Sequence, residues 1–173
     1  MADVDRAHRL TGLPVLLQEF GFASAGGSFD YERGMAYLHG LGYARLADVL
    51  ADPHRFLQAL PADVARVVNK SPEADRAQNA LSLLPHILKQ WPGGSRRYAH
   101  TPEGQAAFYD SLLEQLLAYP HICGAFIYCW SDSERCYLCR AEDCPCETAW
   151  GITYIDETPK PVYDVIRKHF AAV

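Results

Sequence analysis

The chain has little that would bring it to a nucleic acid or into a membrane. Lysine and arginine number 16 against 21 aspartates and glutamates, which gives a net charge of -5. This balance offers no electrostatic attraction to nucleic acid or to an anionic membrane surface. The longest apolar runs are strand-sized, well short of the about 20 residues that cross a bilayer. No apolar segment of a secretory signal follows the charged N-terminus, so we expect a cytoplasmic chain.

The composition is that of an ordinary globular protein. Hydrophobic residues make up 49% of the 173 positions, enough for a domain with its own core. Two short, continuously apolar runs, residues 13–21 (LPVLLQEFG) and 122–130 (ICGAFIYCW), are typical of buried strands in parallel sheets. Helical patterns begin at Thr101, where a cap precedes Pro102, and near Thr158. The alternation predicts parallel β-α-β architecture.

The stretch from residue 22 to residue 100 differs from the rest. Its segments have helical composition and are punctuated by prolines. A structureless loop of this length is improbable inside a compact domain. The sequence therefore predicts a mostly helical insertion after the first strand.

Glu19 is the first candidate for chemistry, because it stands at the end of the first apolar run, before Phe20-Gly21. In parallel α/β barrels, catalytic residues project from the carboxyl ends of strands. A carboxylate buried there costs free energy unless it is paired or hydrogen-bonded. The alternative is a strand-end glutamate that simply reaches solvent, and position alone favours that alternative.

Three segments together strengthen the catalytic interpretation of Glu19. PVLLQEFG (14–21), GAFIYCWSD (124–132) and WGITYIDETPKPVYDVIRKHF (150–170) occur in the same order as similar motifs near the end of retaining β-glycosidases built on the (β/α)8 barrel. The resemblance implies an α/β fold that is a partial (β/α)8 TIM barrel. Residues 1–173 would be its C-terminal part, with strands seven and eight and their helices, and residues 22–100 the helical insertion.

The resemblance also implies roles for four residues. Glu19 would be the nucleophile, and Trp130 the aromatic platform beneath the sugar at the cleaved bond. Tyr128 shares a strand face with Trp130 and is a weaker candidate, while Asp132 could hydrogen-bond sugar hydroxyls. Core packing of Trp130 and a loop-starting role for Asp132 remain alternatives. The substrate class would be a β-linked saccharide, hydrolysed without a cofactor.

The acid partner of this mechanism is missing. In the family it is a Glu that commonly follows an Asn, but Asn69 and Asn79 precede Lys70 and Ala80. No spacing selects a substitute from Glu103, Glu134, Glu142 and Glu157. The resemblance therefore implies an active site that is incomplete in this chain. Either another polypeptide, such as the N-terminal portion of a barrel, completes it, or the chain associates with itself, or it is a truncated product.

Four of the six cysteines crowd into one short segment: Cys136, Cys139, Cys144 and Cys146. Paired thiols at such spacings suit tetrahedral zinc, although the gap between the pairs is shorter than in usual zinc ribbons. A structural zinc clip is one interpretation, and disulfides or reduced thiols are the others. The seven histidines form no ligand motif, and His39, His54, His86 and His100 are interpreted as surface or core residues.

Two other functions stay open from the sequence. One is a non-catalytic carbohydrate-binding or assembly module that keeps part of a sugar site. The other is a metal-stabilised interaction domain organised by residues 22–100 and the cysteine segment.

Overall fold

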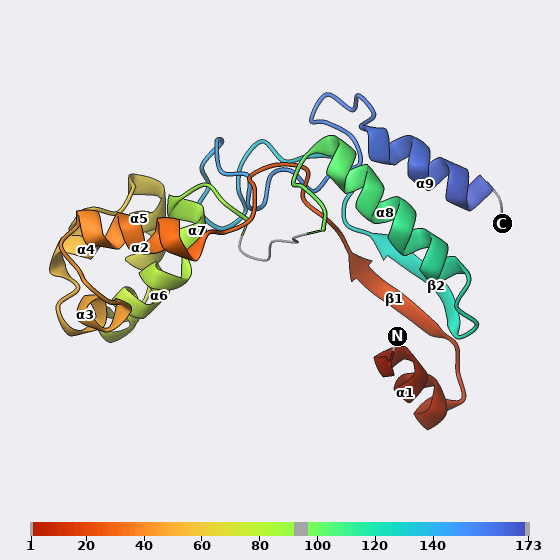
Figure 1. Cartoon of the computed structure of the whole chain (residues 1–173), viewed down its shortest axis with the longest axis horizontal. Coiled ribbons are helices and arrows are strands. Elements are labelled where there is room, and N and C mark those ends of the chain that lie inside the picture. The colour runs from red at the N-terminus through yellow and green to blue at the C-terminus, as the bar shows by residue number, and fades with distance from the viewer. Residues whose placement is uncertain (1, 92–96, 172–173) are drawn as a thin grey trace. The chain divides into compact units, whose positions relative to one another are not determined.

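The computed structural model describes residues 2–91 and 97–171 (Figure 1). The chain divides into two compact units. The first, here called the sheet unit, comprises Met1–Ser24, Tyr98–Asp132 and Ala149–Val173. The second, the helical unit, comprises Ala25–Arg97 and Ser133–Thr148. The cysteine segment therefore belongs to the helical unit, although the sheet unit precedes and follows it in the sequence.

The sheet unit contains two parallel strands and three helices among its described residues. These are α1 (Ala2–Thr11), β1 (Val15–Phe20), α8 (Pro102–Leu117), β2 (Ile122–Ile127) and α9 (Pro161–Ala171). Val15 lies opposite Ile122 and Leu17 opposite Ala125. The predicted cap is confirmed, since the Thr101 hydroxyl accepts a 3.0 Å hydrogen bond from the Gly104 amide.

The core of the sheet unit lies where α8 and α9 pack together beside the strands (Figure 1). Tyr109 and Leu113 on α8 and Val162 on α9 are buried in it, together with Phe22 after β1 and Ile152. The buried residues of each helix recur at helical spacing, so one face of α8 and one face of α9 form this contact.

The prediction of a partial (β/α)8 barrel is wrong. The described residues form a small α/β protein whose sheet has only the two strands β1 and β2. Both predicted strands exist, but Leu16 is 52% exposed and Phe126 is 60% exposed, so the pair is not covered on both faces. An apolar run favours an extended strand without determining what packs over it. The segment around Thr153 makes only isolated bridges, to Ser131 and Pro159.

The helical unit is built from short helical elements between Tyr31 and Ile87, within the stretch of helical composition. Its elements are α2 (Tyr31–Gly40), α3 (Leu46–Ala51), α4 (His54–Gln58), α5 (Ala62–Val68), the 3-10 turn η1 (Glu73–Asp75), α6 (Arg76–Ser82) and α7 (Leu84–Ile87). Pro53, Pro61 and Pro72 each directly precede one of these elements, as expected for a residue that interrupts one helix and starts the next. Residues 92–96 of the predicted insertion lie outside the described residues.

The core of the helical unit combines helix side chains with the cysteine segment. Leu38, Val49, Phe56 and Val64 are almost fully buried. They belong to one cluster with the four cysteines of residues 136–146. The cysteine side chains are thus part of the hydrophobic core of this unit.

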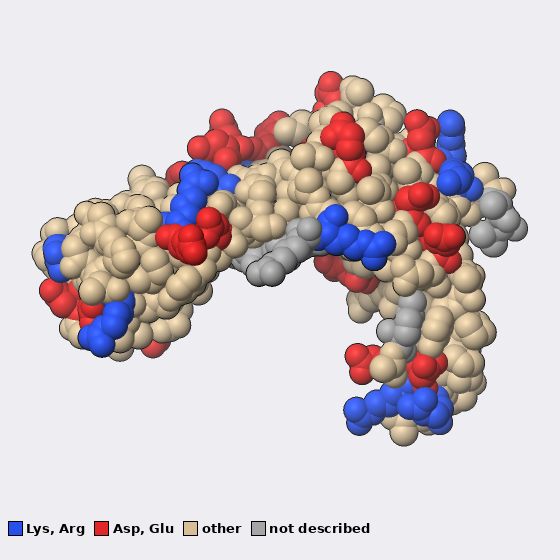
Figure 2. Space-filling view, viewed as in Figure 1, with Lys and Arg blue, Asp and Glu red and all other residues tan. Residues whose placement is uncertain are grey.

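The distribution of surface charge and the length of the helices follow the sequence, which has charges of both signs and only short apolar runs. On the face drawn in Figure 2, described acidic and basic side chains are interspersed. None of the described helices is both long enough and apolar enough to cross a membrane.

Candidate metal centre

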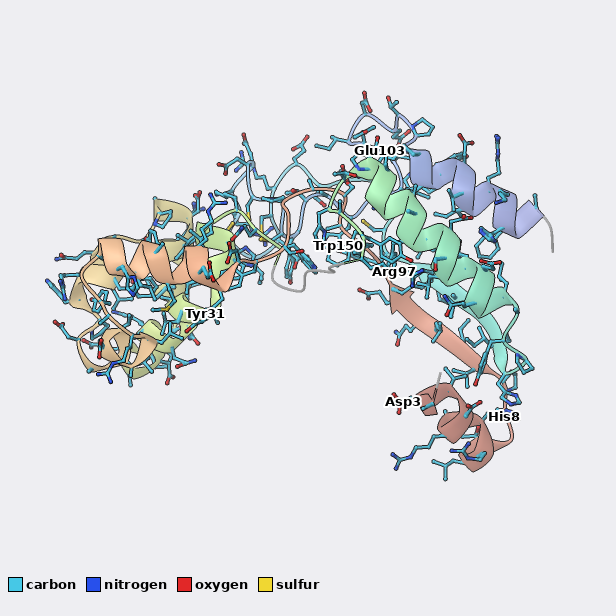
Figure 3. All side chains as sticks on the ribbon, in the orientation of Figure 1. Asp3, His8, Tyr31, Arg97, Glu103 and Trp150 are labelled. Atoms are coloured by element: carbon cyan, nitrogen blue, oxygen red, sulfur yellow. The ribbon has the colours of Figure 1, made fainter. Side chains whose placement is uncertain are left out.

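Four side chains of the helical unit bring potential metal ligands together: His86, Cys136, Cys139 and Cys144. Their ligand atoms all lie within 4.8 Å of one another, and all four residues are buried. His86 comes from α7, while the three cysteines come from the segment between residues 133 and 148. Figure 3 draws the described side chains on the ribbon, with sulfur in yellow. One imidazole and three thiols are a donor set that suits zinc.

The distances to the imidazole fit one tetrahedral ion. His86 Nδ1 lies 3.4 Å from Cys144 Sγ and 3.6 Å from Cys136 Sγ. A tetrahedral zinc with Zn–S of about 2.3 Å and Zn–N of about 2.0–2.1 Å places a nitrogen and a sulfur ligand about 3.5 Å apart. These two nitrogen–sulfur distances are therefore near those that coordination of one ion requires.

The local backbone explains why the segment folds around its sulfurs. Cys136 donates its amide hydrogen to Ala141 O at 2.9 Å, and Arg140 donates to Cys136 O at 2.9 Å. Arg140 has a φ of 65°, in the left-handed region, which closes this tight turn. The amides of Cys139 and Ala141 donate to the sulfurs of Cys136 and Cys139. Such hydrogen bonds favour thiolates, the form that binds a metal.

The thiols on their own hold their protons tightly. The hydrogen bond with Cys144, followed by burial, raises the pKa of Cys136 to about 11. Burial raises the pKa of Cys139 to about 11 as well. Crowded thiolates repel one another in a medium of low polarity, so a cation is needed to hold them ionised. Metal binding at this cluster must therefore release protons.

The pKa of His86 is also raised. Burial alone would lower it, but hydrogen bonds with Cys136 and Cys139 outweigh that effect. The imidazole thus already interacts with the sulfurs that would share an ion with it.

The fourth predicted thiol lies differently. Cys146 is buried, and its Sγ donates to Gln90 O at 2.9 Å instead of joining the four clustered ligands. His86 takes the fourth place, and no spacing in the sequence connects residue 86 with the cysteines. His86 lies in the four-residue helix α7 among apolar neighbours. Nothing in the sequence around it indicates a metal ligand.

An ion pair ties the chain just after α7 to the cysteine segment next to the cluster. Lys89 Nζ lies 2.8 Å from Asp143 Oδ1, with Asp143 directly before Cys144. Because Asp143 is 77% exposed, the pair adds little free energy. The pair marks a contact between the residues after α7 and the chain directly before Cys144.

The carbohydrate candidates all lie in the sheet unit. Glu19 is exposed on β1, and Tyr128 and Trp130 follow β2 with exposed fractions of 41% and 57%. The Tyr128 amide donates to Phe20 O at 2.9 Å, so both strand ends meet at this edge. The ring of Trp130 packs edge-on against Tyr163, with centroids 6.1 Å apart.

Asp132 has an internal structural role. Its Oδ1 accepts hydrogen bonds from Lys160 Nζ at 2.6 Å and from the Gly151 amide at 2.8 Å. Lys160 also donates to Ser24 Oγ at 2.8 Å, and its side chain is 0% exposed. Burial lowers the pKa of Lys160, and the ion pair with Asp132 opposes that shift. The ion pair holds the segment before α9 in place. Asp132 Oδ1 is therefore engaged in hydrogen bonds within the protein.

The fold and the cluster together define a small α/β protein with a buried group of one histidine and three cysteines that could bind a metal. No protein-family model matches the chain, and neither a curated protein nor a solved structure matches it. The resemblance to retaining glycosidases stays a sequence prediction. Function must therefore be inferred from the side chains themselves.

Proposed function

We propose that the helical unit is a zinc-stabilised module in which His86, Cys136, Cys139 and Cys144 hold one Zn²⁺. The observation that carries this proposal is the convergence of four buried ligand atoms within 4.8 Å of one another. Thiolate and imidazole donors in tetrahedral arrangement select zinc over the harder divalent cations.

The ion's role would be structural. Catalytic zinc sites keep one position for water or substrate, whereas closed sites use four protein ligands. Here the donors number four and none is exposed. The segment from Ser133 to Thr148 contains no helix or strand. Zinc would join it to α7 and would supply free energy that its own backbone does not.

The test is metal content and coordination in the purified chain. We expect one zinc per chain, and substitution with Co²⁺ should give the visible absorption of a tetrahedral thiolate site. Cys144→Ser should remove most of the bound metal. Cys146→Ser is the matched control, because Cys146 lies in the same segment but outside the four clustered ligands. No stoichiometric metal, or equal loss in both variants, would refute the assignment.

We propose a second function for the sheet unit, hydrolysis of a β-linked saccharide with Glu19 as nucleophile. The observation that favours it is the exposure of Glu19, Tyr128 and Trp130 at one edge of the strand pair. Retaining enzymes place their two carboxyl groups about 5–5.5 Å apart. Because the sequence offers no recognised acid, a second polypeptide would have to supply it.

Saccharide binding tests this second proposal without requiring turnover. A β-linked oligosaccharide series, titrated against the chain by heteronuclear NMR, should shift signals around Trp130. Trp130→Ala should abolish the shifts, whereas Tyr137→Ala should not, since Tyr137 is a 70% exposed aromatic residue of the helical unit. Undiminished binding by Trp130→Ala would exclude this sugar platform.

A further inference from the structure

The helical unit contains a cavity of about 410 Å³ that the metal centre does not use. Four helices, α2, α3, α6 and α7, form its walls together with Phe29. Leu38 and Leu84 are buried in its lining, whereas Tyr31 is 62% exposed and Leu50 is 49% exposed at its rim. Tyr31, labelled in Figure 3, begins α2.

The lining of the cavity is mostly apolar. None of the described residues that line the cavity carries a charge. Ser82 is one of the few polar residues there, and its hydroxyl already donates to Asn79 O at 2.7 Å. Gln78 contributes a primary amide. An ionic ligand would lose its hydration here without gaining a partner, which costs free energy.

We propose that this cavity is a binding site for a small, uncharged, largely apolar molecule, such as an aromatic or short-chain compound. Its volume lies in the range of about 300–1,000 Å³ that ligand pockets occupy. The buried leucines of the lining would cover one side of such a molecule, and Tyr31 and Leu50 at the rim would contact its edges. Gln78 supplies a polar group that can orient one end of it.

The helix α7 connects this site with the metal centre. Leu84 and Pro85 line the cavity, and His86, the next residue, faces the sulfurs of Cys136 and Cys144. On the proposed zinc function, metal binding fixes the helix that forms one wall of the cavity. Removal of zinc should then weaken the apolar ligand several-fold, while the ligand site itself is tested independently of zinc.

The probe for the test is N-phenyl-1-naphthylamine, an uncharged dye that fluoresces in apolar surroundings. We expect saturable binding at one site per chain. Leu50→Glu should weaken it at least tenfold, because it places a carboxylate at the rim. Ala51→Glu is the matched control, since Ala51 is exposed on the same helix and does not line the cavity. Circular dichroism of both variants checks that α3 and its neighbours still fold.

A substitution that fills the cavity provides a second, independent test of dye binding. Ser82→Trp should occupy the cavity and reduce dye binding, whereas Ser82→Ala should retain it. Absence of saturable binding would overturn the proposal, as would equal affinities of Leu50→Glu and Ala51→Glu. If zinc is absent from the purified chain but dye binding still depends on Leu50 and Ser82, the cavity proposal stands and the metal proposal fails.

Discussion

His86 Nδ1 lies 3.4 Å from Cys144 Sγ, although 58 residues separate the two in the sequence. A metal ion between them would close a long loop that includes α8, β2 and the chain that joins them to the helical unit. Closing a loop of this length restricts the unfolded chain more than a local clip would. On the proposed zinc function, the ion would therefore stabilise a larger part of the chain than the cysteine segment alone.

The first prediction concerns this distant ligand. His86→Ala should lower zinc affinity by about 100-fold, since about 10–16 kcal/mol of binding free energy is shared among four ligands. His54→Ala is the control, because His54 is exposed at the start of α4. Competition with a chromophoric chelator measures both affinities. Equal affinities would show that the sulfurs bind metal without the imidazole.

The second prediction concerns pH. Folding raises the pKa values of Cys136 and Cys139 to about 11. In the zinc-free chain their contribution to stability is fully present below the ordinary thiol pKa, and is lost as pH rises through about 9 toward 11. In the zinc-loaded chain the dependence reverses, because protons compete with the ion as pH falls. Urea midpoints across pH, with and without zinc, measure both curves. Parallel curves would contradict the assignment of the thiols as ligands.

The sequence indicated the clustered thiols of the candidate metal centre but not the histidine beside them. Cys136, Cys139 and Cys144 were predicted because a chelating turn is local, so its spacing is written in the sequence. His86 could not be predicted, since it reaches the cluster only through packing of α7 against a distant segment. Cys146 has the same spacing signal as its neighbours, yet its thiol meets the Gln90 carbonyl.

A similar limit applied to the fold. Both strands and helices α8 and α9 followed from local patterns of apolar residues and caps. The barrel did not follow, because the number of strands and the cover on each face depend on contacts far along the chain. Leu16 and Phe126 carry the same apolar signal as buried strand residues but are more than half exposed.

The third prediction concerns the buried ion pair. Lys160→Met leaves the Asp132 carboxylate without its cation in a largely buried place, and should cost about 3–5 kcal/mol of unfolding free energy. The double variant with Asp132→Asn should lose less than the sum of the two single changes. Lys168→Met is the control, since its ion pair with Asp110 is exposed. A loss below that of Lys168→Met would mean that the pair does not hold the segment before α9.

The fourth prediction concerns the uncovered face of the sheet. Leu16 lies opposite Gly124, and the alternation of strand residues places Phe126 on the same face. Parallel strands are normally covered on both faces, so an exposed apolar face on a two-stranded sheet is unfavourable in water. We therefore expect this face to be covered by a second copy of the chain or by another polypeptide.

Sedimentation velocity over a range of concentrations would measure this association. Phe126→Glu should shift the chain toward the monomer, because a buried carboxylate would be left without a partner in the interface. Leu117→Glu is the matched control, since Leu117 is 42% exposed at the end of α8, away from the strand face. If the parent chain stays monomeric throughout, self-association is excluded and only a different polypeptide could cover the face. If both variants dissociate the assembly equally, the contact is not confined to the strand face.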